Sequence, residues 1–184
     1  MGTNDFTAEQ AARKRPKTGR PPLYTREERK RRDETKWTLV QGLLAPFQFL
    51  VFIVSVWLVC RYLLTGQGET AATISIVIKT ITLYTIMVTG CIWEKVVFGK
   101  YLFAPAFFWE DVVSMGVIAL HTYYLYALLT GVLDTRQQMY VALAAYLIYV
   151  VNAIQFVLKL RAARLGAATL DAAALEAPAG AGAA

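Results

Sequence analysis

Two adjacent acids and the only histidine of the chain lie in one hydrophobic stretch, residues 103–131, which reads FAPAFFWEDVVSMGVIALHTYYLYALLTG. Glu110 and Asp111 come near its start, and His121 lies near its middle. Ionisable groups inside a membrane are costly unless they are paired or face a polar cavity, so by default they indicate function. Carboxyl groups in a poorly hydrated pocket are suited to proton transfer. The stretch therefore predicts acid–base chemistry, provided that neighbouring segments supply a cavity.

Other polar residues fall on helical faces that could form this cavity. Ser114 follows Glu110 by four residues and His121 follows it by eleven, so these three side chains share one face of a helix. Asn152 and Gln155 share a helical face in the same way, and so do Gln41 and Gln48. A third acid, Glu94, ends a neighbouring apolar run. If these faces point inward, they enclose a polar pocket with aromatic residues at its mouth: Trp93, Phe107, Phe108 and Trp109.

The elements that must position these residues are predicted from hydropathy. The 184-residue chain is 57% hydrophobic and 17% charged, with a mean hydropathy of +0.43, which is too apolar for an ordinary soluble domain. Four apolar stretches are each long enough to cross a hydrocarbon layer as a helix. They lie near residues 38–64, 72–93, 107–129 and 138–160. The predicted fold class is an all-α membrane protein with four transmembrane helices.

The distribution of positive charge predicts the topology. The first 36 residues carry eleven Lys or Arg residues against six acids, and the middle linker and the exit from the last span are also basic. Because cytoplasmic segments of membrane proteins are enriched in Lys and Arg, both termini and the polar pocket are expected on the cytoplasmic side. The basic leader suits anionic lipid headgroups. Nucleic acid is not an expected partner, because no aromatic residues interleave with the charges.

These patterns predict three segments. Residues 1–36 form a basic cytoplasmic leader that is largely disordered, residues 37–162 form the four-helix transmembrane domain, and residues 163–184 form a disordered low-complexity tail. Lys79 is expected near the far end of its span, with its amine reaching the interface. Cys60 and Cys91 lie in apolar runs and are expected to be small core residues, so the sequence predicts neither a disulfide nor a metal site.

Each polar residue also has a purely structural explanation. Glu110 and Asp111 could begin a helix at the headgroup level, where acids favour the N-terminal end of the helix dipole. Glu94 could be an interfacial flank, and His121 could bond to a neighbouring backbone carbonyl. Gln and Asn side chains in membrane spans often serve only as hydrogen bonds between helices.

Several longer phrases resemble one family. PLYTREER, WTLVQGLLAPFQFLVF, ITLYTIMVTGCIWEKVVFGKYLFAPAFFWEDVVSM, ALHTYYLYAL and YVVNAIQFVLKLRAARL together resemble the 3-vinyl bacteriochlorophyllide hydratases, also called 2-vinyl bacteriochlorophyllide hydratases or chlorophyllide a 3(1)-hydratases, of photosynthetic bacteria. The resemblance covers roughly residues 21–165. It implies a hydro-lyase of bacteriochlorophyll biosynthesis that adds water to the 3-vinyl group of a chlorophyllide, giving a 3-(1-hydroxyethyl) product. It also implies a multi-pass protein of the bacterial inner membrane, either cytoplasmic or intracytoplasmic.

The reaction needs one acid and one base and no separate cofactor, because the magnesium belongs to the substrate. We expect Glu110 to be the general acid and Asp111 or Glu94 to position or deprotonate the water, although the three roles could permute. His121 could ligate the magnesium or relay a proton. The residues expected to bind the substrate or orient water are Ser114, Trp93, Trp109, Asn152, Gln155, Gln48 and Tyr124.

Two functions of other classes remain as alternatives. The same pocket could belong to a non-catalytic pigment carrier or assembly factor for photosynthetic complexes. A small proton-coupled transporter is the third alternative, and it is disfavoured because the polar residues are expected in one half of the membrane only. Other enzymes of bacteriochlorophyll biosynthesis are candidate partners. The sequence leaves a homo-oligomer open, since the small-residue face with Ala142 and Ala145 permits close contact between helices.

Overall fold

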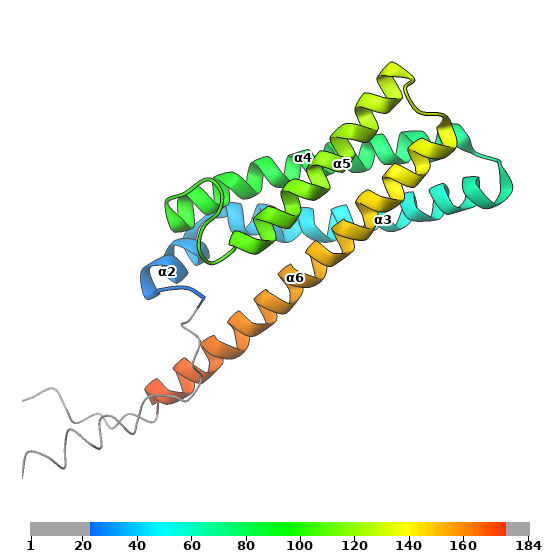
Figure 1. The fold of residues 1–184 in the computed structure, drawn as a ribbon. Coiled ribbons are helices and arrows are strands. Elements are labelled where there is room, and N and C mark those ends of the chain that lie inside the picture. The colour runs from blue at the N-terminus through cyan, green and yellow to red at the C-terminus, as the bar shows by residue number, and fades with distance from the viewer. Residues whose placement is uncertain (1–22, 176–184) are drawn as a thin grey trace, which may run out of the picture.

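The computed structural model describes residues 23–175, and all its regular elements in that range are helices (Figure 1). The short helix α2 spans Arg26–Glu34 and precedes four long helices: α3 (Lys36–Thr65), α4 (Glu69–Phe98), α5 (Phe108–Thr130) and α6 (Thr135–Leu175). The four long helices are each long and apolar enough to cross a membrane. Within the described residues, the all-α class and the four predicted spans are therefore confirmed. The sequence before residue 23 and after residue 175 lies outside them.

Local sequence signals set the helix boundaries. α3, α4 and α5 each end at a glycine with positive φ, namely Gly66, Gly99 and Gly131, and this left-handed conformation is strained for other residues. α6 begins with a reciprocal pair of hydrogen bonds between Asp134 and Gln137, in which each side chain accepts from the backbone N–H of the other residue. These bonds satisfy donors that a helix start would otherwise leave unpaired.

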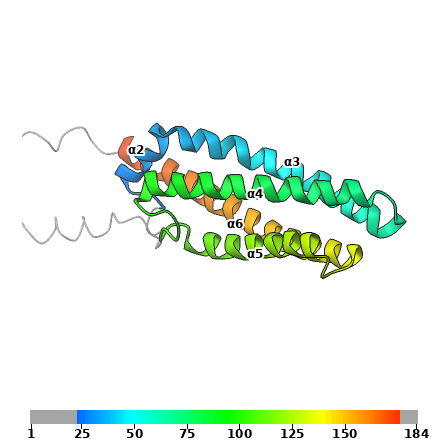
Figure 2. The same cartoon turned by 90° about the horizontal axis from the view of Figure 1, so that it is seen from above.

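The four long helices form two antiparallel hairpins. α3 packs chiefly against α4, and α5 packs chiefly against α6, while contacts between the hairpins are fewer (Figures 1 and 2). We call the surface where the hairpins meet the seam. We call the end that holds α2 and the loop 99–107 the terminal end, and the opposite end, with the connections after α3 and α5, the hairpin end.

The hydrophobic core lies nearer the hairpin end. It is formed by Val59, Ala72, Ile76, Tyr124, Met139, Ala142 and Tyr146. Ala142 and Ala145 are almost completely buried on α6, so this small-residue face packs against neighbouring helices of the same chain. Where helices cross the apolar layer, such small side chains allow their backbones to approach.

The structure differs from the sequence-based description at both ends of the bundle. Residues 26–34, assigned to a largely disordered leader, form α2, which begins with a capping box between Thr25 and Glu28. Tyr24 stacks on Phe98 at 5.7 Å between ring centroids and lies under the guanidinium of Arg32 at 4.7 Å, so α2 is held against the bundle. α6 continues through the predicted boundary at residue 162 as far as Leu175.

α3 contains a proline inside its apolar span. Pro46 has no backbone N–H, so it cannot donate the helical hydrogen bond to the carbonyl four residues earlier, that of Gly42. A Cβ atom built at Gly42 would meet no other atom within 4 Å, so the helix is loosely surrounded at this point.

The packing of α6 can be tested with two adjacent alanines. Ala145 is fully buried and Ala144 is exposed. We expect Ala145→Leu to lower the free energy of unfolding by about 1–3 kcal/mol, because the larger side chain must force the helices apart. Ala144→Leu is the matched control and should change stability by less than about 0.5 kcal/mol. Thermal or denaturant unfolding in detergent measures both, and equal tolerance of the two variants would contradict the described packing.

Candidate active site

Three buried carboxyl groups come together at the terminal end. Glu94, near the end of α4, and Asp111, in the first turn of α5, lie on opposite sides of the seam, and both carboxyl groups accept hydrogen bonds from the loop 99–107. Glu110 is the neighbouring residue on α5, and all three side chains are almost completely buried. The sequence-based expectation that these acids project into the protein, instead of outward into solvent, therefore agrees with the structure.

Glu110 has a basic partner that the sequence analysis did not include in the site. Lys159 of α6 forms an ion pair with the Glu110 carboxylate, and its ammonium group also lies 5.0 Å from the centre of the Phe107 ring. The lysine side chain remains partly exposed, while the Glu110 side chain is almost buried.

The loop 99–107 closes over the other two acids. The backbone N–H of Phe103 donates to Asp111 Oδ2 at 2.7 Å, and the N–H of Ala104 donates to Glu94 Oε2 at 3.4 Å. Phe103 has φ = 58°, a left-handed conformation that costs a residue with a side chain about 1–2 kcal/mol. The strained turn thus directs consecutive amide groups toward the carboxyl pair.

Further polar residues continue from the acids along the seam. Asn152 Nδ2 donates to Ser114 Oγ at 2.7 Å, which joins α6 to α5. The side-chain oxygens of Asn152, Gln155 and Gln48 are buried without a hydrogen-bond partner among the described residues. These groups therefore have acceptor capacity that a ligand or water could use. Gln41, in contrast, donates to Thr89 Oγ1 at 2.7 Å and serves as a hydrogen bond between helices.

The aromatic residues expected at the pocket mouth have different positions. Phe107 is buried, and Trp93 packs edge-on against it at 5.6 Å between ring centroids. Trp93 also donates its indole N–H to Thr38 Oγ1 at 2.9 Å. Trp109 is 68% exposed and therefore does not line a buried site. Trp93 thus belongs to an aromatic cluster beside the site, whereas Trp109 is placed for contact with the membrane interface.

A second polar cluster lies deeper in the bundle, around His121. The Nδ1 atom of His121 is 2.8 Å from the carbonyl oxygen of Val117, and the Nε2 atom of His121 has no hydrogen-bond partner among the described residues. Lys79 is completely buried, with its ammonium nitrogen 3.7 Å from the centre of the Tyr149 ring. The expectation that the Lys79 amine reaches the interface is therefore wrong, because the side chain turns into the seam instead.

Hydrogen bonds join this deeper cluster to the remaining helices. Ser55 of α3 bonds to Ser75 of α4 at 2.8 Å and to the Tyr146 hydroxyl of α6 at 2.6 Å, and the Tyr146 ring lies 5.8 Å from that of His121. Tyr124, expected to bind substrate, is completely buried near this cluster and far from the carboxyl groups. Buried polar residues therefore extend beyond the half of the membrane in which they were expected.

Lys159 and Lys79 are the residues that sequence reasoning missed. Lys159 follows Gln155 by four residues and Asn152 by seven, so helical spacing already placed it on the same face as those polar residues. It was counted only as a flanking positive charge. Lys79 was an ionisable residue inside an apolar span, and the general expectation of function for such residues applied to it as well.

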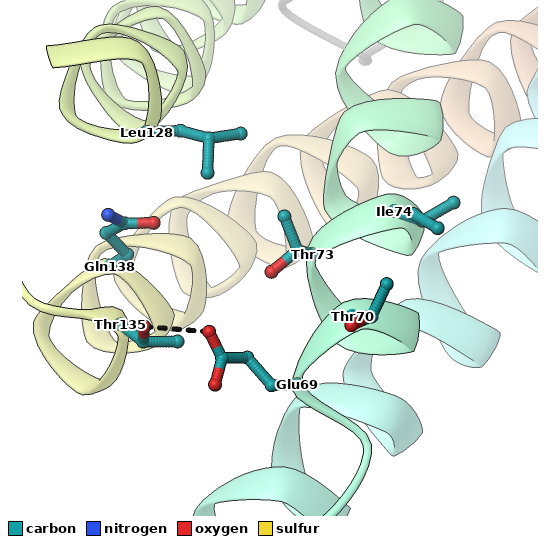
Figure 3. A pocket seen from close by; sticks show the side chains of 7 residues that line it. All are labelled: Glu69, Thr70, Thr73, Ile74, Leu128, Thr135 and Gln138. Atoms are coloured by element: carbon teal, nitrogen blue, oxygen red, sulfur yellow. Dashed lines mark hydrogen bonds between the residues drawn. The ribbon is translucent and has the colours of Figure 1, made fainter. Parts of the chain in front are cut away.

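Two hollows in the described part of the chain lie away from Glu94, Glu110 and Asp111. One, of about 250 Å³, lies at the hairpin end and is lined by Glu69, Thr70, Thr73, Ile74, Leu128, Thr135 and Gln138 (Figure 3). Within it, Thr135 donates a hydrogen bond to Glu69 at 3.0 Å. The other, of about 230 Å³, is an almost wholly apolar groove between α3 and α4. The predicted pocket that opens beside the acids stays a prediction.

Comparison with known proteins gives a consistent result. Residues 24–162 match the family profile of 2-vinyl bacteriochlorophyllide hydratase. The chain belongs to the 2-vinyl bacteriochlorophyllide hydratase family. A protein of that name from Rhodobacter capsulatus is 69% identical over 156 residues, covering 85% of this chain and 91% of the relative. One from Cereibacter sphaeroides is 70% identical over 143 residues, covering 78% and 89%. No solved structure matches. The family match includes both polar clusters and the loop 99–107.

The ion pair at the site predicts a double-variant cycle. Lys159→Met leaves the buried Glu110 without its partner and should reduce the free energy of unfolding by about 1–3 kcal/mol. This loss is smaller than the roughly 3–5 kcal/mol that follows from breaking a fully buried ion pair, because Lys159 is partly exposed. Glu110→Gln combined with Lys159→Met should lose less stability than Lys159→Met alone. Denaturant unfolding of these two variants and of Glu110→Gln alone completes the cycle, and a loss in the double variant equal to the sum of the single losses would show that the two side chains do not interact.

Proposed function

We propose that this chain adds water across the vinyl group of a chlorophyllide-type tetrapyrrole during bacteriochlorophyll biosynthesis. The reaction converts R–CH=CH2 and H2O into R–CH(OH)–CH3, so no electrons are exchanged and no separate redox cofactor is required. Family membership carries this proposal, and the site adds support because it brings a carboxyl pair and an ion-paired carboxylate together in a buried position. One acid and one base are what the addition requires.

The carboxyl pair of Glu94 and Asp111 supplies the proton. The carboxyl groups of Glu94 and Asp111 are buried and accept hydrogen bonds from consecutive amides of the loop 99–107, so they lie close together. Two negative charges are costly at such close range in a poorly hydrated site, which supports a proton on one of the two groups. Transfer of this proton to the terminal vinyl carbon places positive charge on the adjacent carbon, and the conjugated macrocycle spreads that charge.

Glu110 acts as the base in this scheme. Its carboxylate is held by Lys159 and can accept a proton from water as the water oxygen bonds to the cationic carbon. The sequence leaves the assignment among Glu94, Glu110 and Asp111 open, and we give the role of base to Glu110 because it is the one of the three that forms an ion pair among the described residues. Ser114, Asn152 and Gln155 line the neighbouring part of the seam and orient the water or the polar edge of the ring.

His121 ligates the magnesium of the substrate. A ring nitrogen that contacts a carbonyl oxygen must carry the hydrogen, so the contact of Nδ1 with Val117 leaves the lone pair on Nε2. This orienting bond resembles those of metal-binding histidines generally, in which the second nitrogen donates to a carbonyl or carboxylate. Nε2 is buried and has no hydrogen-bond partner among the described residues, which supports its availability as an axial ligand.

The terminal end faces the cytoplasm, and the protein is a multi-pass component of the bacterial inner membrane. The basic residues of α2 and the lysines beside the loop 99–107 support this orientation. The substrate enters from the lipid along the seam, where contacts between the hairpins are sparse. Other enzymes of the pathway are candidate partners that supply or remove the pigment.

The direct test is incubation of the purified membrane protein with a 3-vinyl chlorophyllide in detergent. We expect a product heavier by one water, with its long-wavelength absorption band shifted to the blue because the vinyl group leaves the conjugated system. Mass spectrometry and absorption spectra measure the change. Stoichiometric pigment binding with no change of mass over long incubation would instead support a non-catalytic carrier or assembly factor.

The acid–base assignment is tested with carboxamide variants. Glu110→Gln should lower kcat by about 10²–10⁴-fold, and so should Asp111→Asn, because general acid–base catalysis contributes factors of this size. Pigment binding should survive in both variants. Glu69→Gln is the matched control, because it alters an acid at the opposite end of α4 and should leave kcat unchanged.

The two variants should also change the pH–rate profile in opposite ways. Loss of the base should remove the fall in rate toward low pH, and loss of the acid should remove the fall toward high pH. Full activity of Glu110→Gln would remove that residue from the mechanism.

A further inference from the structure

Lys79 has the features of a binding residue whose ligand is not part of the protein. Its side chain is completely buried in the half of α4 nearer the hairpin end, and its amine nitrogen makes no hydrogen bond to any described residue. It forms no ion pair with a carboxylate of residues 23–165 either. Its close neighbour is the face of the Tyr149 ring at 3.7 Å. A cation–π contact contributes about 2 kcal/mol when desolvated, less than the loss of hydration of an ammonium group.

The groups around Lys79 supply no negative charge. The side chains that approach it from the other helices are those of Tyr149 on α6 and His121 on α5, and both are neutral or cationic. The hydroxyl cluster of Ser55, Ser75 and Tyr146 lies on the same seam and is uncharged. The seam therefore holds a basic group without a counter-ion, and the complement of its charged form is an anion of modest size.

We propose that Lys79 binds the free propionate carboxylate of the tetrapyrrole substrate. This inference rests on the proposed function and names the subsite that recognises the acid form of the pigment. A chlorophyllide differs from the corresponding chlorophyll in that this carboxylate is not esterified. An ammonium group buried in an apolar seam distinguishes the two forms, because only the free acid pairs with it.

The dimensions of the bundle are consistent with this arrangement. Lys79 and Glu94 are fifteen residues apart on one helix, which is about 22 Å along the axis at roughly 1.5 Å per residue. This distance is longer than the macrocycle alone. It can be covered by the ring together with its propionate and the side chains of Lys79 and Glu94. If the magnesium were bound at His121 with the vinyl edge of the ring directed toward the acids of the terminal end, the propionate would extend from another edge of the ring and could reach Lys79.

The seam also provides a route for the ring. Because each hairpin is held together more extensively than the two are held to each other, the hairpins can separate without unpacking either one. Lys79, His121 and Tyr149 all point into this seam from three different helices. A flat pigment that enters between the hairpins meets the ammonium, the imidazole and the aromatic face together.

The test compares a 3-vinyl chlorophyllide with its methyl ester as substrates for the full-length protein. Wild type should show a KM at least tenfold lower for the free acid, with similar kcat for both. Lys79→Met should raise KM for the acid to the value for the ester and leave the ester kinetics within about threefold of wild type. Lys79→Arg should keep the preference for the acid. Lys100→Met, which removes an exposed lysine, is the control and should behave as wild type.

The possible outcomes separate this subsite from the function itself. Equal KM values for acid and ester in wild type would overturn the subsite even if Lys79→Met failed to fold. Retention of the preference for the free acid in Lys79→Met would also overturn the subsite. If Lys79→Met bound the ester normally but no longer hydrated it, Lys79 would act in the chemistry, and the subsite would again be overturned. If wild type hydrates neither compound, the proposed function fails instead. Equal binding of the free acid by wild type and Lys79→Met in absorption titrations would then overturn the subsite independently.

Discussion

The structure depends on satisfying buried polar groups where the surroundings supply no water. At the terminal end, the carboxyl groups of Glu94 and Asp111 accept hydrogen bonds from consecutive backbone amides of the loop 99–107. These bonds hold the connection between the hairpins over the seam, so the acids serve the fold as well as the proposed chemistry. Irregular backbone at a membrane boundary is tolerated only when its polar groups find partners in the protein. The loop and the acids therefore require each other.

The four apolar runs were sufficient to predict the spans. Their lengths and hydropathy placed α3, α4 and α5 to within about five residues, whereas α6 continues well beyond its predicted end. The face formed by Glu110, Ser114 and His121 was predicted from spacing alone, and all three side chains are buried. These successes share a physical cause, because helical periodicity and the thickness of the membrane act locally along the chain.

The partners of the polar residues could not be predicted in the same way. The pairing of Glu110 with Lys159 and the approach of Lys79 to Tyr149 depend on how α6 crosses α4 and α5, which periodicity does not determine. Lys79 was misplaced because an isolated lysine in an apolar span is usually expected to extend to the nearest interface. Helix α2 did carry a local signal, the Thr25–Glu28 capping box, but the high charge of its surroundings outweighed it.

Pro46 has a consequence for the motions of the bundle. Without a donor for the Gly42 carbonyl, α3 lacks one rung of its hydrogen-bond ladder, so bending there breaks no bond at that step. The part of α3 before this point is tied to α4 by two hydrogen bonds: Gln41 donates to Thr89, and Thr38 accepts from Trp93. Bending of α3 is therefore expected at Gly42 and Pro46, between these bonds and the hydrophobic core. Such a joint would let the membrane-facing wall of the bundle yield sideways as a bulky pigment passes.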